Sequence, residues 1–248
     1  MDLKGKVAIV TGGGTGMGKA ISTLLGAHGV NVAVNYSRSE ADAVQTAEEL
    51  TAAGVEAMPI QADVSVAADV ARMVEQTEKQ FGRIDLLVNN AGYTAFVPMK
   101  DLDGMLEDEW DKIMDINVKG IWLCTKAAAP AMKRAGGGAV VNVASVAGLK
   151  VAGSSMAYAV SKAAAIHLTK CLALALSPEI RVNAVAPGLV VTRWWAHAGE
   201  ERLKQMSEAL PLQHSVTPEQ VASTMFELLT NEAITGQVVA LDSGGLLP

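Results

Sequence analysis

Short apolar runs alternate with longer amphipathic segments over the whole chain. The runs have the length and composition of buried β-strands: Val7–Val10, Val30–Val34, Glu56–Gln61, Ile84–Val88, Ala139–Val143, Arg181–Ala186 and Gln237–Leu241. Apolar residues recur at helical spacing in the segments between them: Lys19–His28, Glu40–Ala53, Ser65–Phe81, Asp108–Arg134, Ser155–Leu176 and a last helix that opens at the capping box Thr217-Pro218-Glu219-Gln220.

This alternation favours one architecture. Strands joined by helical crossovers pair in parallel, so we predict an α/β fold with a doubly wound, seven-stranded parallel sheet. No linker or repeat divides residues 1–248, which we expect to form a single domain with one irregular insertion, Leu189–Ser215. Two local features are also expected: Ser65 caps its helix, and Pro130 kinks or tightens the end of the long helix.

A glycine-rich turn, Thr11–Gly18, follows the first predicted strand directly. Glycines at the start of a helix let the backbone approach a phosphate, which the helix N-terminus attracts. The strict dinucleotide pattern G-x-G-x-x-G fails at Met17, and the triphosphate-binding loop fails at Ala20, where a Ser or Thr would hold Mg²⁺. The pattern that remains is Thr-Gly-x-x-x-Gly-x-Gly.

Other polar or glycine-containing segments also follow predicted strands: Asn89–Gly92, Ser145 and Pro187-Gly188. Ligands of open α/β sheets bind beyond the carboxyl ends of the strands. We therefore expect these segments and the glycine-rich turn to line one cleft.

Tyr158 and Lys162 lie four residues apart in an Ala-rich helical segment, so both side chains share one helix face. A free phenol titrates near pH ~10, and a neighbouring ammonium favours its ionised form. The pair is therefore a candidate for proton transfer, although the spacing alone also fits a surface lysine beside a half-buried tyrosine.

Composition and charge narrow the class of protein. Half of the residues are hydrophobic but only 4% are aromatic, which is typical of a parallel sheet with a Val, Ala, Leu and Ile core. The net charge of −6, with acids and bases interspersed, predicts neither a nucleic-acid partner nor an anionic membrane surface. Cys124 and Cys171 are expected to be buried apolar residues. Because we find neither a signal-like N-terminal run nor an uncharged stretch of membrane-spanning length, we expect a soluble cytoplasmic protein.

Taken in order, these motifs resemble those of the short-chain dehydrogenase/reductase family over nearly the whole chain. Within that family the resemblance is to carbonyl and 3-oxoacyl reductases. Ser145 precedes Tyr158 by the thirteen residues common in that family. The matching positions are Thr11-Gly12, Gly16, Gly18, Ala62-Asp63-Val64, Asn89-Asn90-Ala91-Gly92, Asn117, Ser145, Tyr158, Lys162, Pro187-Gly188, Thr192 and the ending Thr235–Gly245. The resemblance implies a Rossmann-type domain that transfers a hydride between a nicotinamide cofactor and a carbonyl or secondary alcohol.

The resemblance also implies residue roles. Tyr158 would be the general acid/base and Ser145 would hydrogen-bond the substrate oxygen; Lys162 would hold the nicotinamide ribose and lower the pKa of Tyr158, and Asn117 would anchor a water linking Lys162 to solvent. The implied cofactor-binding residues are Gly12, Thr15, Gly16, Met17, Gly18, Tyr36, Ser37, Arg38, Asp63, Val64, Asn90, Ala91, Gly92, Tyr158, Lys162, Pro187, Gly188, Val190 and Thr192.

The residues after the second predicted strand decide which nicotinamide is expected. An NAD site places an acid there for the ribose 2′-hydroxyl, whereas an arginine suits a 2′-phosphate. This chain has Ser37-Arg38-Ser39 and no carboxylate before Glu40, so we predict NADP(H), with NAD as the alternative. Thr15 argues against NADP(H), because many NADP-linked members of the family that the chain resembles carry a basic residue at this place in the glycine-rich turn.

The residues that would bind the substrate are indicated less clearly by the sequence than those that would bind the cofactor. Trp194 and Trp195 in the insertion predict an apolar lid over the substrate, with Tyr93 and Phe96 as the opposite wall; the alternative is a tryptophan pair packed against the core or a second subunit. His197 and His214 fit solvent-side loop residues better than catalysts, and no metal-ligand pattern is present in the sequence.

The sequence also bears on the substrate, on assembly and on alternative functions. The small-molecule substrate is a carbonyl or alcohol; if it is an acyl-carrier-protein thioester, Lys133 and Arg134 are candidates to meet the acidic carrier near the site mouth. The apolar helix Ala163–Leu176 and family resemblance predict a homotetramer. A catalytically idle dinucleotide-binding regulator is the non-enzyme alternative, which the joint presence of Asn117, Ser145, Tyr158 and Lys162 disfavours.

Overall fold

The computed structural model describes residues 2–195 and 198–248. The strands are β1 (Val7–Val10), β2 (Asn31–Tyr36), β3 (Ala57–Gln61), β4 (Leu86–Asn89), β5 (Gly138–Val143), β6 (Ile180–Pro187) and β7 (Val238–Leu241). The helices are α1 (Gly16–Ala27), α2 (Glu40–Ala52), α3 (Ala67–Phe81), α4 (Glu107–Met114), α5 (Gly120–Arg134), α6 (Met156–Leu176), α7 (Glu200–Glu208) and α8 (Pro218–Thr230). Three short turns of helix, η1 (Asp115–Lys119), η2 (Val146–Gly148) and η3 (Arg193–Trp195), complete the list.

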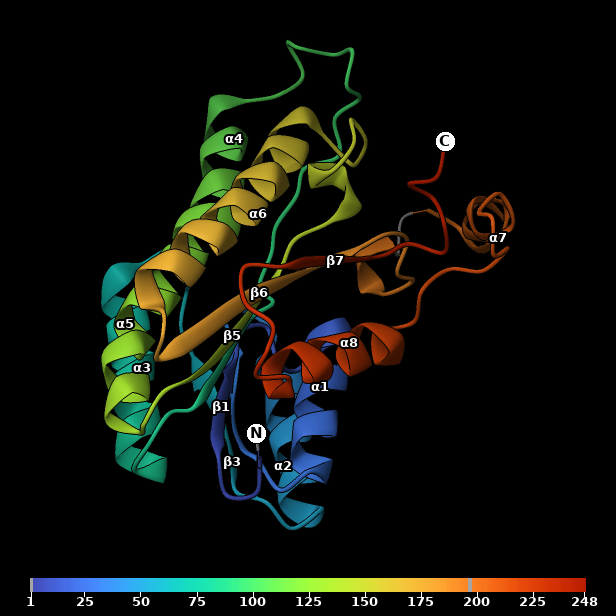
Figure 1. Ribbon diagram of the computed structural model, residues 1–248. Helices are drawn as coiled ribbons and strands as arrows, with labels where there is room; N and C mark the ends of the chain where they lie inside the picture. Colours follow the sequence, from blue (N-terminus) through green and yellow to red (C-terminus); the bar gives the residue numbers. More distant parts are fainter. Residues whose placement is uncertain (1, 196–197) are drawn as a thin grey trace.

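All seven strands form one parallel sheet in the order β3-β2-β1-β4-β5-β6-β7, which confirms the predicted fold class. Helices α1, α2 and α8 cover one face, and α3, α5 and α6 cover the other (Figure 1). The order reverses between β1 and β4, and such a switch point opens a crevice at the carboxyl ends of the strands. The sheet thus determines where a ligand can bind.

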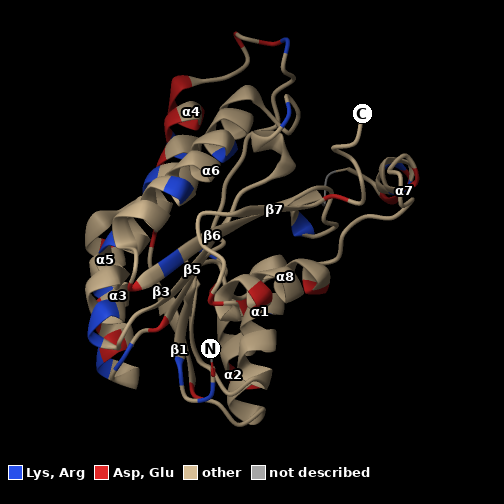
Figure 2. Ribbon diagram, in the orientation of Figure 1, with Lys and Arg blue, Asp and Glu red and all other residues tan. Residues whose placement is uncertain are grey.

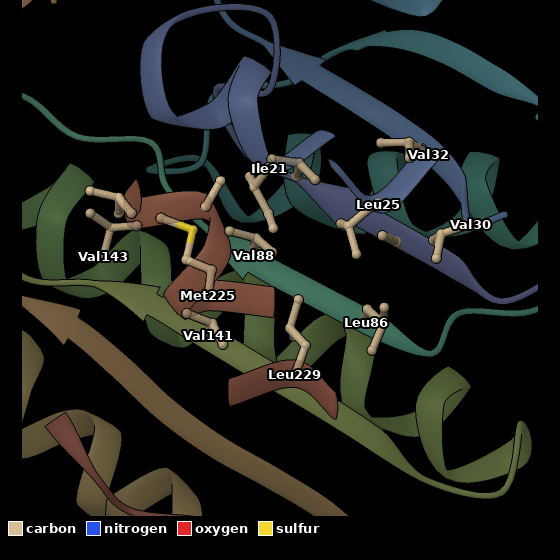
Figure 3. Packing of buried hydrophobic residues seen from close by; sticks show 14 of the residues in the cluster. Ile21, Leu25, Val30, Val32, Leu86, Val88, Val141, Val143, Met225 and Leu229 are labelled. Carbon is tan, nitrogen blue, oxygen red and sulfur yellow. The ribbon is translucent and has the colours of Figure 1, made fainter. Parts of the chain in front are cut away.

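The cores on both faces consist almost entirely of aliphatic side chains. On the α1 and α8 face, Ile21 and Leu25 of α1 meet Met225 and Leu229 of α8 over the sheet (Figure 3). These side chains are fully buried, and burying one such side chain stabilises the fold by roughly 1.5–3 kcal/mol. The scarcity of aromatic residues therefore does not limit the core.

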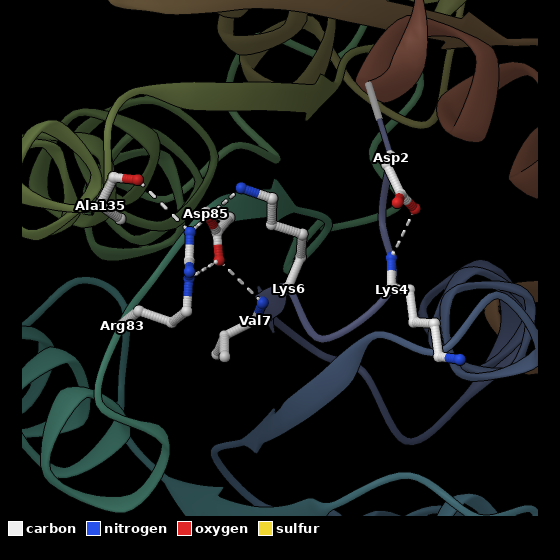
Figure 4. Close-up of polar contacts among 7 residues, drawn as sticks. All are labelled: Asp2, Lys4, Lys6, Val7, Arg83, Asp85 and Ala135. Atoms are coloured by element: carbon white, nitrogen blue, oxygen red, sulfur yellow. Dashed lines mark hydrogen bonds and ion pairs between the residues drawn. The ribbon is translucent and has the colours of Figure 1, made fainter.

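A buried carboxylate ties the strands together at their amino ends. Asp85 lies beside β4 and accepts hydrogen bonds from the Lys6 ammonium at 3.0 Å, the Arg83 guanidinium at 2.6 Å and the backbone N–H of Val7 at 3.0 Å (Figure 4). The side chain of Asp85 is 1% exposed, whereas both cations reach solvent. The pairing raises the pKa of Arg83 and anchors β1 to β4 at the edge opposite the crevice.

The structure corrects several local expectations. The predicted helix Asp108–Arg134 is interrupted at Asp115–Lys119 by one π-helical turn, a feature frequent at functional sites. Ser65 does not cap α3, because its backbone N–H and its hydroxyl both donate to Asp63 Oδ1. Cys124 is buried as expected, but Cys171 is exposed because it lies on the outer face of α6.

The insertion is more regular than expected. It contains η3 and the helix α7, and Val190 and Val216, at its two ends, form a parallel bridge. Helix α7 has no buried residue, and its apolar positions, Leu203 and Met206, stand at helical spacing and are half-buried. Residues 196 and 197, and with them the expectation for His197, lie outside the described residues.

Charges and apolar residues are unevenly spread over the helices. The first turn of α4 is acidic, with Glu107, Asp108 and Glu109, whereas the basic residues lie mainly on the layer formed by α3 to α6 (Figure 2). Helix α6 is long and apolar enough to meet the length and composition of a membrane span, a weak criterion that core helices also meet.

Candidate active site

A cleft of about 700 Å³ opens at the carboxyl ends of β1, β2 and β4. It is lined by most of the residues that the sequence assigns to the cofactor: Gly12, Thr15, Gly16, Met17, Tyr36, Ser37, Arg38, Asp63, Val64, Asn90, Ala91, Gly92 and Thr192. Tyr93 and Trp194, which the sequence assigns to the substrate, lie on its wall as well. One cavity thus connects the predicted cofactor and substrate residues.

The glycine-rich turn is shaped to admit a phosphate backbone. Gly12 has a φ of +61°, which favours glycine, and Gly18 lies so close beneath the turn that a Cβ there would stand 2.1 Å from the carbonyl oxygen of Gly12. Asn90 donates hydrogen bonds from its side chain to the carbonyls of Thr11 and Gly12 at 2.9 and 3.1 Å. The turn is thereby fixed at the N-terminus of α1, and these residues fit a dinucleotide pyrophosphate.

The adenosine end of the cleft is formed by the segment after β2. Tyr36 donates a hydrogen bond to Glu40, so this carboxylate is engaged with the phenol. Ser37, Arg38 and Ser39 are exposed at the cleft wall, and they provide hydroxyl and guanidinium donors. Asp63 accepts from Ser65 in a tight local turn beside them.

Some predicted residues lie outside the cleft wall and support it from behind. Val190 is buried in the core beneath the insertion, and Gly18 packs under the turn. Gly188 donates its backbone N–H to Leu241 at 2.8 Å, and a Cβ there would stand 2.7 Å from Cβ of Asp242. Pro187 accepts from the Ser145 hydroxyl through its carbonyl oxygen at 3.4 Å. Their contribution is to position the turn, β6 and Ser145.

Several lining residues were not identified from the sequence. Asn35 accepts from the backbone N–H of Gly12 and donates to the carbonyls of Ile60 and Ala62, so it ties the turn to the ends of β2 and β3. Its position at the end of a strand that leads to the cleft was the available signal. Arg72, Lys112 and Arg193 add cations to the wall, and no local sequence pattern indicates them.

Ser145, Tyr158 and Lys162 come together next to the cleft: none of them lines it, but Tyr158 lies beside the lining residue Trp194, and a Cβ on the lining residue Gly92 would lie 3.8 Å from Lys162 Nζ. Ser145 follows β5, and its Oγ accepts from the backbone N–H of Ala147 at 3.2 Å. Tyr158 lies in the first turn of α6, which Ser155 caps by accepting from the Tyr158 backbone N–H. The Lys162 ammonium, one turn later and 3% exposed, lies 5.6 Å from the centre of the Tyr158 ring.

Burial governs the acidity of this pair. It raises the pKa of Tyr158 to about 12, an effect that a hydrogen bond with Ser145 opposes. It also lowers the pKa of Lys162 to about 8. The net shift of the Tyr158 pKa is thus upward in the protein alone, and the expectation that Lys162 lowers this pKa stays a prediction. The Nζ of Lys162 donates to the carbonyl oxygen of Val143.

Asn117 links the π-helical turn to Tyr93 and to Ser161 of α6. Its side chain accepts from the Tyr93 backbone N–H at 2.8 Å and donates to the Tyr93 carbonyl and to Ser161 Oγ at 2.9 and 3.0 Å. A Cβ on Gly92 would lie 3.5 Å from Asn117 Oδ1 and 3.8 Å from Lys162 Nζ. The π-helical turn thus brings Asn117 beside the lysine although the two lie on different helices.

Two aromatic pairs join the insertion to other parts of the chain. Trp194 stands 5.8 Å from Tyr158 between ring centres, and Trp195 meets Phe96 edge to face at 6.1 Å. Tyr93 is turned toward α4 instead, where its hydroxyl bonds to Glu109 and Lys112 lies over its ring. His214 is exposed on the insertion.

Lys133 and Arg134 lie away from the entrance of the cleft of their own chain. They end α5 at the amino edge of the sheet, where Lys133 pairs with Glu179 at 3.3 Å and Arg134 with Glu78 at 2.7 Å. The expectation that they stand beside the site entrance is wrong, because α5 runs away from the cleft toward the start of β5.

Comparison with known proteins agrees with this geometry. The family model for short chain dehydrogenases matches residues 6–203. A candidate ketoacyl reductase of the granaticin polyketide synthase of Streptomyces violaceoruber is 41% identical over 243 residues, which cover 97% of this chain and 96% of that protein. The 3-oxoacyl-acyl-carrier-protein reductase FabG of Staphylococcus aureus is 39% identical over 244 residues, covering 96% and 97%.

A solved structure shares the fold over the whole chain. The short-chain type dehydrogenase/reductase from Mycobacterium marinum superposes with a TM-score of 0.92 at 33% identity, over 100% of this chain and 98% of the other. The likeness therefore includes the insertion and both ends of the sheet. The chain belongs to the short-chain dehydrogenase/reductase family and is an NAD(P)-dependent oxidoreductase that acts on carbonyl or hydroxyl groups.

Proposed function

We propose that this enzyme reduces an apolar carbonyl compound to a secondary alcohol with NADPH, using Tyr158 as the acid, Ser145 as the donor to the substrate oxygen and Lys162 as the cation beside them. The observation that carries the proposal is the meeting of these three side chains next to the cleft, where Tyr158 contacts both the Ser145 hydroxyl and the ring of the lining residue Trp194. The glycine-rich turn, Asn90 and Thr192 would hold the cofactor there. When bound, the reduced nicotinamide supplies the hydride.

The chain supplies the proton and stabilises the developing charge. Negative charge grows on the carbonyl oxygen, where hydroxyl donors from Ser145 and Tyr158 stabilise it. Because burial keeps the pKa of Tyr158 near 12, the phenol is protonated at neutral pH and can donate its proton to the alkoxide. The same pKa makes the reverse reaction, which needs the phenolate, favour alkaline pH.

The segment after β2 supports NADP(H) over NAD. Arg38 faces the cleft, no ion pair engages it among the described residues, and the first acid after it, Glu40, is held by Tyr36. A free guanidinium with hydroxyl neighbours suits a 2′-phosphate better than a ribose diol. Exchanging Arg38 for Asp should move the preference toward NAD.

A second candidate substrate is a 3-oxoacyl thioester, because relatives at 39–41% identity carry ketoacyl or oxoacyl reductase names. The aromatic rings around Tyr158 favour a bulky apolar ketone instead, and the basic pair Lys133 and Arg134 stands away from the mouth within the chain. Acetoacetyl thioesters and bulky ketones, assayed side by side, separate these two candidates.

The proposal includes a homotetramer in the cytoplasm. Helices α5 and α6 leave Trp122, Val160 and Leu174 exposed, at 43%, 43% and 85%. A second copy covering these residues would bury this surface, since such apolar patches mark interfaces. Sedimentation at micromolar concentration would contradict the proposal if it gave a monomer.

A panel of ketones and alcohols, followed at the nicotinamide absorbance, tests the function. We expect turnover of an apolar ketone with a higher kcat/KM for NADPH than for NADH. Tyr158→Phe should abolish turnover while NADPH still binds. Equal turnover by Tyr158→Phe would refute the assigned mechanism, and equal or higher kcat/KM with NADH would refute only the cofactor preference.

A further inference from the structure

An ion pair joins the insertion to the start of α2. A terminal nitrogen of Arg193, in η3, lies 3.0 Å from Asp42 Oδ2 in the first turn of α2, although the two residues are 151 positions apart in the sequence. Arg193 lines the same cleft as Arg38, which lies four residues before Asp42.

This pair lies against the glycine-rich turn. A Cβ on Gly14 would stand 2.7 Å from the backbone nitrogen of Ala43 and 3.0 Å from the carbonyl carbon of Asp42, so the start of α2 touches the turn directly. A methyl carbon of Thr192, next to Arg193, would lie 3.4 Å from a Cβ on Gly16. The insertion therefore meets the turn on one side while α2 meets it on the other.

The pair contributes little to stability. Arg193 and Asp42 are 64% and 38% exposed, and ion pairs at such exposure are screened by solvent and contribute little to folding. Its effect is orientation: the carboxylate holds one end of the guanidinium, and an arginine carries five N–H donors. The donors that Asp42 does not take remain available to a second acceptor.

The other cations of the wall are held differently. Arg72 pairs with Asp69 within its own helix, and Lys112 lies 4.1 Å from the centre of the Tyr93 ring. Only Arg193, among the described cations of this wall, is tied to the helix that begins just after Arg38. The phosphate that a base after β2 would hold is the 2′-phosphate.

We propose that Arg193, oriented by Asp42, is a second cation for the 2′-phosphate of the cofactor and acts together with Arg38. A phosphate monoester carries nearly two negative charges at pH 7, and arginine binds phosphate oxygens in paired hydrogen bonds. The proposal rests on the NADP(H) preference proposed above. It adds a specificity residue from the insertion, far in sequence from the segment after β2.

Calorimetric titration of the whole protein with 2′,5′-ADP and with 5′-AMP tests this, because the probes differ by one phosphate. Arg193→Ala should weaken 2′,5′-ADP binding about tenfold and 5′-AMP binding less than about twofold. Arg202→Ala removes the same charge from exposed α7 and should change neither. Thr15→Arg, added to Arg193→Ala, places a guanidinium on the same cleft and should restore much of the lost affinity.

The outcomes separate this proposal from the proposed cofactor preference. Wild-type protein that prefers 2′,5′-ADP, together with an Arg193→Ala variant that keeps this preference, overturns the role of Arg193 alone. Equal weakening for both probes overturns it too. Wild-type protein that binds both probes equally refutes the NADP(H) preference and the role of Arg193 together. Melting of each variant without ligand confirms folding, and Arg193→Gln replaces any alanine variant that fails to fold.

Discussion

Lys162 donates a hydrogen bond from Nζ to the carbonyl oxygen of Val143, at 2.8 Å and out of reach of solvent. The bond draws the ammonium to the end of β5 and fixes it beneath the Tyr158 ring. A buried ammonium costs free energy even with one good acceptor. Catalytic arrangement and stability therefore oppose each other at this residue.

The first prediction concerns the pH dependence of stability. In the folded protein the pKa of Lys162 is lowered to about 8, below its ordinary value of 10.5, so the unfolded chain binds the proton more tightly. Stability should therefore rise with pH between about 8 and 10.5, because only the folded state loses the proton there. Relative to Lys162→Met, the wild-type free energy of unfolding should increase by roughly 3 kcal/mol across that window.

Urea unfolding of both proteins without cofactor, at several pH values, measures this difference. Cys124 and Tyr158 titrate in both proteins, so their contributions largely cancel in the comparison. A wild-type curve that runs parallel to that of the methionine variant would mean that the ammonium is not desolvated as its position indicates.

Ser145 should act on the transition state rather than on binding. Its hydroxyl lies beside Tyr158 and lowers the pKa of that phenol. Ser145→Ala removes a donor to the developing oxyanion, so kcat should fall by about 10²-fold or more, with KM and NADPH affinity nearly unchanged. Ser207→Ala in α7, whose hydroxyl bonds only to the Leu203 carbonyl among described partners, is the matched control. A loss confined to KM would contradict the assigned role.

The strands and the α/β class could be predicted from the sequence because burial on both faces leaves apolar runs such as Val7–Val10. Helix α7 was not predicted, because two apolar positions at helical spacing, Leu203 and Met206, are a weak signal in a helix with no buried residue. Ser65 failed as a cap because Asp63, two residues earlier, accepts from its hydroxyl. Local patterns mislead where a neighbouring side chain competes for the same group.

Some residues of the candidate site could be predicted from the sequence and others could not. Tyr158 and Lys162 are four apart on one helix, so their association is visible in the sequence. Arg193 meets Asp42 only through the folding of the insertion over α2, which no short-range spacing encodes. The raised pKa of Tyr158 could not be predicted from the pair alone, because its cause is burial of the phenol in the folded chain.

The two insertion tryptophans should affect substrate binding. Trp194 flanks Tyr158 and Trp195 meets Phe96, so removing either ring takes apolar surface from the substrate end. Trp194→Ala and Trp195→Ala should each raise KM for a bulky ketone about tenfold, with NADPH affinity little changed. Unchanged KM and kcat in both variants would remove the case for a lid.

Asp85 should matter for stability and not for catalysis. It is buried at the sheet edge opposite the cleft and accepts from Lys6, Arg83 and Val7. Asp85→Asn leaves two cations without their counter-charge; because both reach solvent, we expect a loss of about 2 kcal/mol rather than the full cost of a buried charge. Thermal unfolding should show it, with kcat/KM unchanged at 25 °C, whereas Glu208→Gln on exposed α7 should change neither.

Gly18 tests whether the glycine-rich turn, Thr11–Gly18, binds the cofactor. An added Cβ would stand 2.1 Å from the Gly12 carbonyl oxygen and 2.6 Å from Asn90 Nδ2, both of which hold the glycine-rich turn in place. Gly18→Ala must therefore push the turn away from α1, at a cost of about 1–3 kcal/mol. NADPH and NADH affinity should both fall at least about tenfold, since the turn serves the pyrophosphate that they share. Gly92→Ala, whose nearest contact would be 3.5 Å, should leave stability unchanged. Undiminished affinity for both cofactors in Gly18→Ala would show that they bind elsewhere.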